Sequence, residues 1–186
     1  AGAENARGAA PTAAAAGAFT ALMLSYFEKT QTISLPDEKQ ITLPLFDGIM
    51  TGHEASCTVI KDAGDDPDVT HGAEIGCSIK LTEQQGITFR AGVGIGTVTI
   101  PGLQLLPGEP AINPTPRKMV HQTLLNLAEQ YHYKGGWEVT PFIPLGKALA
   151  DRTFNPRIGV IGGLSILGTS GYVRPYSSEA FLNAIL

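Results

Sequence analysis

The densest group of ionisable side chains lies in residues 61–75, KDAGDDPDVTHGAEI. This stretch holds four aspartates, one glutamate, one lysine and one histidine, and apolar segments border it on both sides. Because neighbouring carboxylates repel one another, a cation, an array of hydrogen-bond donors or a ligand must offset their charge. The alternative is a solvated turn in which the aspartates bond to their own backbone amides. The pattern does not match a calcium-binding EF-hand, because Gly64 and Gly72 fall at the wrong positions and the closing glutamate is missing.

A second candidate site lies at the start of a helix predicted over residues 116–131. Arg117 and Lys118 fall in its first turn, where the helix dipole disfavours cations. One interpretation is an exposed helix end that tolerates them. The other is an anion site, in which the two cations and free backbone amides converge on a carboxylate or phosphate.

A glycine-rich run near the end of the chain is the third candidate. Gly162-Gly163 and Gly168-Thr169-Ser170-Gly171 are typical of turns that bring backbone amides close to a ligand. Tight packing of glycine against another element is the alternative. A further motif, Gly92-x-Gly94-x-Gly96, lacks the last glycine of the dinucleotide fingerprint, and Pro101 prevents a long helix from following it.

The elements that must position these residues follow from hydrophobic spacing. Apolar residues recur on one face of a helix near 13–27, with Pro11 outside it, and on one face of the helix over 116–131, which Thr115 can cap and Gly135-Gly136 ends. Strands are expected around a hairpin turn at 36–39 and in four further segments: Ala55–Ile60, Glu74–Leu81, Ile87–Ala91 and Trp137–Ile143. Strands outnumber crossover helices, so the sequence predicts an α+β fold with a mixed or largely antiparallel sheet and helices packed on it.

Length and composition exclude several classes of protein. A chain of 186 residues suits one domain, and its formal net charge of -4 gives no general attraction to nucleic acid or anionic membranes. It contains no apolar run long enough to cross a bilayer and no visible secretory signal. Cys57 and Cys77 flank the acidic loop on neighbouring strands, where buried free thiols in a reducing cytosol are favoured over a disulfide. A cytoplasmic location is therefore expected.

Four ordered motifs stand out along the chain: the acidic stretch from Lys61 to Gly72, residues 108–114 (GEPAINP), residues 154–159 (FNPRIG), and residues 162–171 (GGLSILGTSG) running on to Val173-Arg174-Pro175. Together they resemble the CbiD family of cobalamin biosynthesis. The resemblance departs at the N-terminus, where Gly8–Thr12 replaces a Thr-Thr-Gly element usual in the family. We expect residues 1–11 to be a frayed end, 12–176 to form a CbiD-like N-terminal region, and 177–186 to begin a helix leading to a C-terminal domain.

The resemblance implies an enzyme, cobalt-precorrin-5B C-methyltransferase, of anaerobic cobalamin biosynthesis. It transfers a methyl group from S-adenosyl-L-methionine to a ring carbon and yields cobalt-precorrin-6A. The implied partner is a cobalt-containing tetrapyrrole, with cobalt only as part of the substrate, and a homo-oligomer is possible; no metal site, nucleic acid or membrane is expected. The hypothetical roles are catalytic for Asp65, Asp66 and His71; substrate-binding for Arg117, Arg157, Arg174, Glu109 and Asn113; and cofactor-binding for Gly162, Gly163, Thr169 and Ser170.

Two other function classes remain open. The segment can be a non-catalytic tetrapyrrole-binding domain, with the methyl donor bound elsewhere. It can also be a metal-dependent hydrolase that uses the aspartate cluster with His71. Binding of S-adenosylmethionine favours the methyltransferase over the first, and a metal-induced rise in melting temperature favours the hydrolase.

Overall fold

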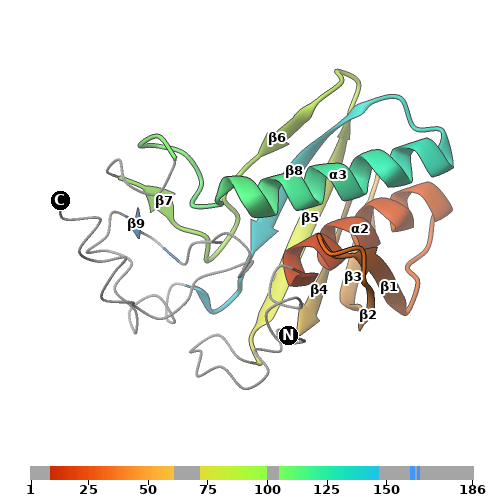
Figure 1. Ribbon diagram of the computed structural model, residues 1–186, viewed down its shortest axis with the longest axis horizontal. Coiled ribbons are helices and arrows are strands. Elements are labelled where there is room, and N and C mark those ends of the chain that lie inside the picture. The colour runs from red at the N-terminus through yellow and green to blue at the C-terminus, as the bar shows by residue number, and fades with distance from the viewer. Residues whose placement is uncertain (1–8, 61–71, 100–104, 147–159, 162, 164–186) are drawn as a thin grey trace.

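The computed structural model (Figure 1) describes residues 9–60, 72–99, 105–146, 160–161 and 163. Within these residues seven short strands lie between two helices, and two more strands follow the second helix. The helices are α2 (Ala9–Leu24) and α3 (Pro114–Tyr131). The strands are β1 (Thr30–Ser34), β2 (Gln40–Pro44), β3 (Phe46–Thr51), β4 (Glu54–Ile60), β5 (Glu74–Thr82), β6 (Ile87–Phe89), β7 (Thr97–Val98), β8 (Gly136–Phe142) and β9 (Val160–Ile161).

A five-stranded sheet in the order β3-β4-β5-β8-β6 forms the centre of the described structure. Its neighbours pair antiparallel except β6, which lies parallel to β8. β1 and β2 form a separate hairpin, and β7 pairs with β9. The prediction of an α+β fold with a mixed, largely antiparallel sheet is confirmed. The predicted hairpin around residues 36–39 is confirmed as well.

Both helices lie on the same face of the sheet, with α3 beside α2 (Figure 1). The opposite face carries polar side chains: Ser78 donates a hydrogen bond to Glu54 (2.8 Å), and Arg90 pairs with Glu138 (2.6 Å). This division explains the alternation of buried and exposed residues along β4, β5 and β8.

Helix α2 corrects two sequence predictions. It begins at Ala9 rather than after Thr12, so Pro11 lies inside it, and residues 9–11 are buried rather than frayed. It is also buried on all sides from Ala9 to Ala21 instead of along one stripe. The reason is that the sheet, the β1–β2 hairpin and α3 all pack on α2. Alanine suits this position because its short side chain lets three neighbours approach the helix closely.

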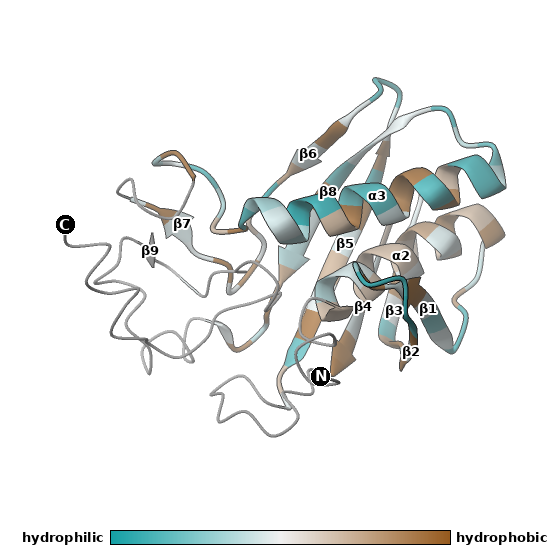
Figure 2. Cartoon of the chain, in the orientation of Figure 1, coloured by the Kyte–Doolittle hydropathy of each residue, from teal (hydrophilic) through white to brown (hydrophobic). Residues whose placement is uncertain are grey.

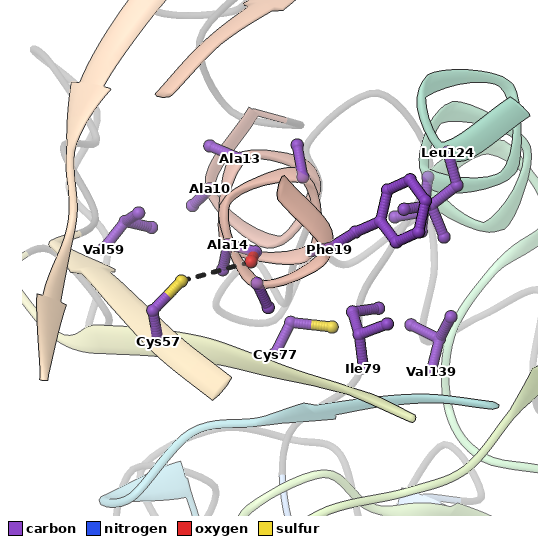
Figure 3. Close-up of a cluster of buried hydrophobic side chains, with 14 of the residues drawn as sticks. Ala10, Ala13, Ala14, Phe19, Cys57, Val59, Cys77, Ile79, Leu124 and Val139 are labelled. Atoms are coloured by element: carbon purple, nitrogen blue, oxygen red, sulfur yellow. Dashed lines mark hydrogen bonds between the residues drawn. The ribbon is translucent and has the colours of Figure 1, made fainter. Parts of the chain in front are cut away.

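The core lies between α2, α3 and the sheet (Figure 3). Phe19 points from α2 towards α3 and meets the rings of Tyr133 and Trp137 edge-on, with centroid distances of 5.3 and 5.7 Å. Beneath α2, Cys57 and Cys77 are cross-strand partners in register. Both are free and buried, which confirms the prediction of reduced thiols. The thiol of Cys57 donates a hydrogen bond to the carbonyl oxygen of Ala14.

Helix α3 is amphipathic and extends to Tyr131, as the sequence predicts, but it starts two residues earlier than predicted and its C-cap is His132 rather than Gly135-Gly136. Figure 2 shows teal and brown residues alternating along α3, whereas α2 is mostly pale. The helix starts at Pro114 with Asn113 as its N-cap, because the extended Asn113 (ψ 161°) precedes a proline that suits the first helical position. The last helical residue is Tyr131, and His132 is the C-cap, with a left-handed backbone (φ 56°). The amide of His132 donates to the carbonyl of Glu129, and the amide of Tyr133 donates to that of Ala128.

Candidate functional site

Described residues that belong to or border three of the four family-like motifs lie at one end of the central sheet. These motifs are the acidic stretch, residues 108–114 and the glycine-rich run that contains Gly163. At this end Ile60 pairs with Glu74, so the acidic stretch connects two paired strand ends, and Gly76 pairs with Phe142 at the end of β8. The backbone amide of Gly92, beyond β6, bonds to the carbonyl of Pro141 (2.9 Å). The N-terminal end of α3 is at this end too, on the side of β7 (Figure 1). Loops supported by a rigid sheet are the usual place for binding residues.

The loop before α3 is held to β7 by backbone hydrogen bonds. The amide of Val98 donates to the carbonyl of Glu109 (2.9 Å), and the amide of Gly108 donates back to Val98 (2.7 Å). Two residues away along each segment, the amide of Ala111 donates to the carbonyl of Gly96 (2.9 Å). Ala111 and Ile112 are buried, so residues 108–112 form an ordered connection into the helix.

The guanidinium of Arg117 is bonded to this loop. Its Nε donates to the carbonyl oxygen of Ile112 (2.6 Å), and its Nη2 donates to that of Pro110 (3.1 Å). The guanidinium carbon lies 5.4 Å from the centre of the Phe89 ring, a cation–π distance. The side chain is only 22% exposed. Two of its five N–H donors are therefore committed to backbone carbonyls.

Glu109 faces the same guanidinium at longer range. Its Oε1 is 3.9 Å from Nη1 of Arg117, and its Oε2 accepts a hydrogen bond from the backbone amide of Leu106 (2.8 Å). Burial lowers the pKa of Arg117, and the charge of Glu109 opposes that change. An arginine stays protonated in either case, so this end of α3 carries an internal cation paired with a carboxylate.

Asn113 occupies the N-cap position of α3, but its side chain does not bond to the helix. Its side chain makes no capping hydrogen bond, and its Oδ1 is buried without a partner among the described residues. The cause is local: the N-cap oxygen normally accepts from the second or third helical amide, and the third residue is Pro116. Pro114 also lacks an N–H. Of the first three helical positions only Thr115 has an amide hydrogen, so the predicted array of free amides for an anion is reduced.

Gly163 is the one predicted cofactor-binding residue that the structure describes. A Cβ atom on Gly163 would collide with the carbonyl group of Gly94, and one on Gly146 would meet the same carbonyl. Gly94 itself has a positive φ of 80° and lies against the carbonyl of Ile143. These contacts are the close packing that the sequence left open as the alternative to ligand binding.

The remaining candidate residues lie outside the described part of the chain. The structure places only Glu109, Asn113, Arg117 and Gly163 of the predicted site, and it brings the first three together. The residues outside it are Asp65, Asp66, His71, Arg157, Arg174, Gly162, Thr169 and Ser170. Sequence reasoning missed Phe89, whose ring supports Arg117, because an apolar residue in a strand gives no sign of a cationic neighbour.

Lys118 does not share the environment of Arg117. It is exposed and lines a groove of about 520 Å³ between α3 and the turn after β1, together with Leu35, Met119 and Gln122. The two cations that looked equivalent in the sequence therefore have different roles in the structure. Arg117 is used internally, and Lys118 faces solvent.

Two further observations concern membrane-spanning helices and metal sites in the described residues. Neither helix there is long and apolar enough to cross a membrane. No group of three or more His, Cys, Asp or Glu side chains in that part of the chain is arranged to hold a metal ion.

Known proteins of one family match most of this chain. The model of the family described as CbiD matches residues 5–175. A Pseudomonas syringae protein named cobalt-precorrin-5B C(1)-methyltransferase is 48% identical over 178 residues, covering 96% of this chain and 48% of the relative. Proteins of the same name are 54% identical over 153 residues in Pseudomonas fluorescens (82% of this chain, 42% of the relative) and 44% identical over 178 residues in Marinomonas sp. (96% and 46%).

A solved structure shares the fold. The crystal structure of the cobalamin biosynthesis protein CbiD from Archaeoglobus fulgidus superposes with a TM-score of 0.64 at 23% sequence identity. The match covers 96% of this chain and 56% of that one. The chain thus spans about half the length of the curated relatives it matches.

Proposed function

The chain belongs to the CbiD family, and from this premise we propose that the protein it represents is a cytoplasmic methyltransferase. The proposed reaction moves a methyl group from S-adenosylmethionine to a ring carbon of cobalt-precorrin-5B and gives cobalt-precorrin-6A, a step of cobalamin biosynthesis. The observation that carries the proposal is the 48% identity over 178 residues to a relative with that name.

The chemistry asks little of individual side chains. S-adenosylmethionine supplies an activated methyl group on a sulfonium, so the protein has to align the attacking carbon with it and exclude water. No nucleophilic side chain is needed. The loop of residues 108–113 supports this role, because its conformation is fixed from both sides by β7 and Arg117.

The residues present fit a ligand with several hydrogen-bonding groups. Glu109 is 38% exposed and offers a carboxylate, while Asn113 has a side-chain oxygen without a partner. Arg117 keeps three N–H donors beyond its two backbone bonds, which leaves it able to meet a substrate carboxylate. We retain Arg157 and Arg174 as proposed partners of the other ring carboxylates, and Asp65, Asp66 and His71 as proposed groups for proton movement.

A second candidate is a tetrapyrrole-binding half of such an enzyme without its own site for the methyl donor. The observation that favours it is the length of the chain, about half that of its curated relatives. The two candidates differ in which ligand binds to residues 1–186.

Calorimetric titration of both ligands into the folded chain tests the proposal. We expect S-adenosylmethionine and cobalt-precorrin-5B each to bind with a stoichiometry near one. Binding of the tetrapyrrole alone would replace the proposal with the second candidate. Binding of neither by a folded sample would contradict both.

A further inference from the structure

We propose that Arg117 is a positioning residue for the methyl donor: by fixing the backbone of residues 110–112, it holds the side-chain oxygen of Asn113 unpaired for an N–H or O–H group of that ligand. This inference rests on the proposed function, because it assigns a contact within the same site. It differs from the family-based expectation, in which Arg117 clamps carboxylates of the tetrapyrrole.

The free oxygen of Asn113 is the first step of the argument. A buried acceptor without a hydrogen bond is unfavourable, so proteins seldom keep one. Here Pro116 removes one of the two amides that could cap the helix, and the oxygen makes no bond to the other, that of Thr115. A ligand that donates a hydrogen bond to this oxygen recovers that cost on binding. The residue is partly exposed, so rotation of its carboxamide can present the oxygen to a ligand.

The second step is the chemistry of the two ligands. An ionised carboxylate is an acceptor only and cannot bond to a carboxamide oxygen. The side chains of the tetrapyrrole are carboxylates, whereas S-adenosylmethionine carries an ammonium, an adenine amino group and ribose hydroxyls. The unpaired oxygen of Asn113 is therefore complementary to the methyl donor rather than to the ring carboxylates.

The third step is the bonding of Arg117. Its two shortest contacts go to the carbonyls of Pro110 and Ile112, directly before Asn113, and the Phe89 ring supports its planar group. A lysine at this position keeps the charge but lacks the fork that reaches two carbonyls. Arg117→Lys therefore separates a positioning role from a purely electrostatic one.

Hydrogen exchange tests the positioning role without any ligand. In Arg117→Lys we expect the amides of Glu109 and Ala111, which lie in this loop, to exchange about tenfold faster than in the unsubstituted chain. Arg90→Lys is the matched control, because Arg90 follows Phe89 in sequence but pairs with Glu138 and is 62% exposed. Unchanged exchange in Arg117→Lys, or an equal effect of Arg90→Lys, would overturn the role of Arg117.

Calorimetry with S-adenosylhomocysteine, the demethylated donor, tests the role of Asn113. We expect Asn113→Leu to weaken its binding by about tenfold, the effect of one lost hydrogen bond worth about 1.4 kcal/mol. Asn113→Asp keeps an acceptor oxygen at a favourable N-cap and should bind within about threefold of the unsubstituted chain. We expect Arg117→Lys to weaken binding as well, although it keeps the charge.

The outcomes separate this inference from the proposed function. Unchanged affinity in Asn113→Leu would overturn the inference, while methyl transfer, measured separately, could still stand. A loss of affinity in Asn113→Leu that Asn113→Asp restores would support it, since both variants share the loss of the amide nitrogen. No binding of S-adenosylhomocysteine by the unsubstituted chain would overturn the assignment of Asn113 to the methyl donor.

Discussion

At the residue scale, the loop before α3 is stabilised by side chains that bond to the backbone rather than to one another. Arg117 donates to two carbonyls, and Glu109 accepts from the amide of Leu106. Asn113 breaks this pattern, because its side-chain oxygen has no such bond. Residues that are kept at some cost to stability are often functional.

Asn113→Ala should therefore leave the fold as stable as before. Replacing a bonded N-cap by alanine costs about 0.5–2 kcal/mol, but Asn113 makes no capping bond, so we expect a change in unfolding free energy within about 0.5 kcal/mol. Urea unfolding measures it. Asp37→Ala is the control, because Asp37 does accept a backbone hydrogen bond from Lys39, and it should cost more. A loss of more than about 1 kcal/mol in Asn113→Ala would show that the side chain caps the helix.

The two buried cysteines give a prediction about pH. Burial raises the pKa of Cys57 to about 12 and raises that of Cys77 as well. The folded state thus holds these protons more tightly than the unfolded chain, whose thiols ionise near pH 8.5. Their contribution to stability is complete below that pH and is lost as the pH rises towards 12.

Thiol titration and alkaline unfolding measure this effect. We expect both thiols to resist a disulfide reagent at pH 8 until denaturant is added. The unfolding free energy should fall between pH 9 and 12 less steeply in a Cys57→Ala, Cys77→Ala variant than in the unsubstituted chain. Fast labelling of the folded chain at pH 8 would mean that the thiols are accessible.

At the element scale, the sequence predicted most strands, both helices and the C-terminal end of α3, but not the ends of α2 or the start of α3. β4, β5 and β8 have enough β-branched and aromatic residues to be recognised locally. The start of α3 was misplaced because Thr115 and Asn113 are both good N-caps, and only the folded backbone decides between them. The burial of α2 on every side could not be predicted, because its larger apolar residues mark only one face and alanine suits buried and exposed helix positions alike. The parallel pairing of β6 with β8 depends on long-range contacts.

The same reasoning explains what was predicted of the site. The resemblance of residues 108–114 to the CbiD family was what identified Glu109 and Asn113. The sequence did not reveal that Arg117 forms hydrogen bonds inside the protein, because its partners are main-chain carbonyls, which every residue carries. Gly163 could equally be a ligand-binding or a packing glycine until its neighbour Gly94 was known.

The glycine contacts beside β7 give a prediction with a matched control. Gly94 and Gly72 both have φ of 80°, but a Cβ at Gly94 meets the carbonyl of Ile143, whereas one at Gly72 meets nothing within 4 Å. Both alanine variants share the backbone strain, so their difference measures the steric contact alone. We expect Gly94→Ala to lower the unfolding free energy by about 1–3 kcal/mol more than Gly72→Ala. Equal losses would mean that strain alone matters and that this close packing contributes nothing.

At the scale of the whole molecule, the core covers one face of the sheet and the candidate site lies at one end of the sheet. α2 and α3 cover one face of the sheet (Figure 1) and enclose the core there, while the opposite face carries polar pairs. The loop that holds Glu109 and Asn113 lies at one end of the sheet, together with Arg117 in the first turn of α3. The acidic stretch also begins and finishes at this end. The chain spans about half the length of its curated relatives.

The most direct test is methyl transfer by a chimera in which this chain replaces the matching segment of the Pseudomonas syringae relative. The chimera is incubated with cobalt-precorrin-5B and S-adenosylmethionine carrying a ¹³C-methyl group, and the corrinoid product is examined by mass spectrometry. We expect a product heavier by one labelled methyl group, and an unlabelled tetrapyrrole when the donor is omitted. A folded chimera that leaves the substrate unchanged, beside an active parent enzyme, would contradict the proposal that this chain supplies its half of a cobalt-precorrin-5B methyltransferase.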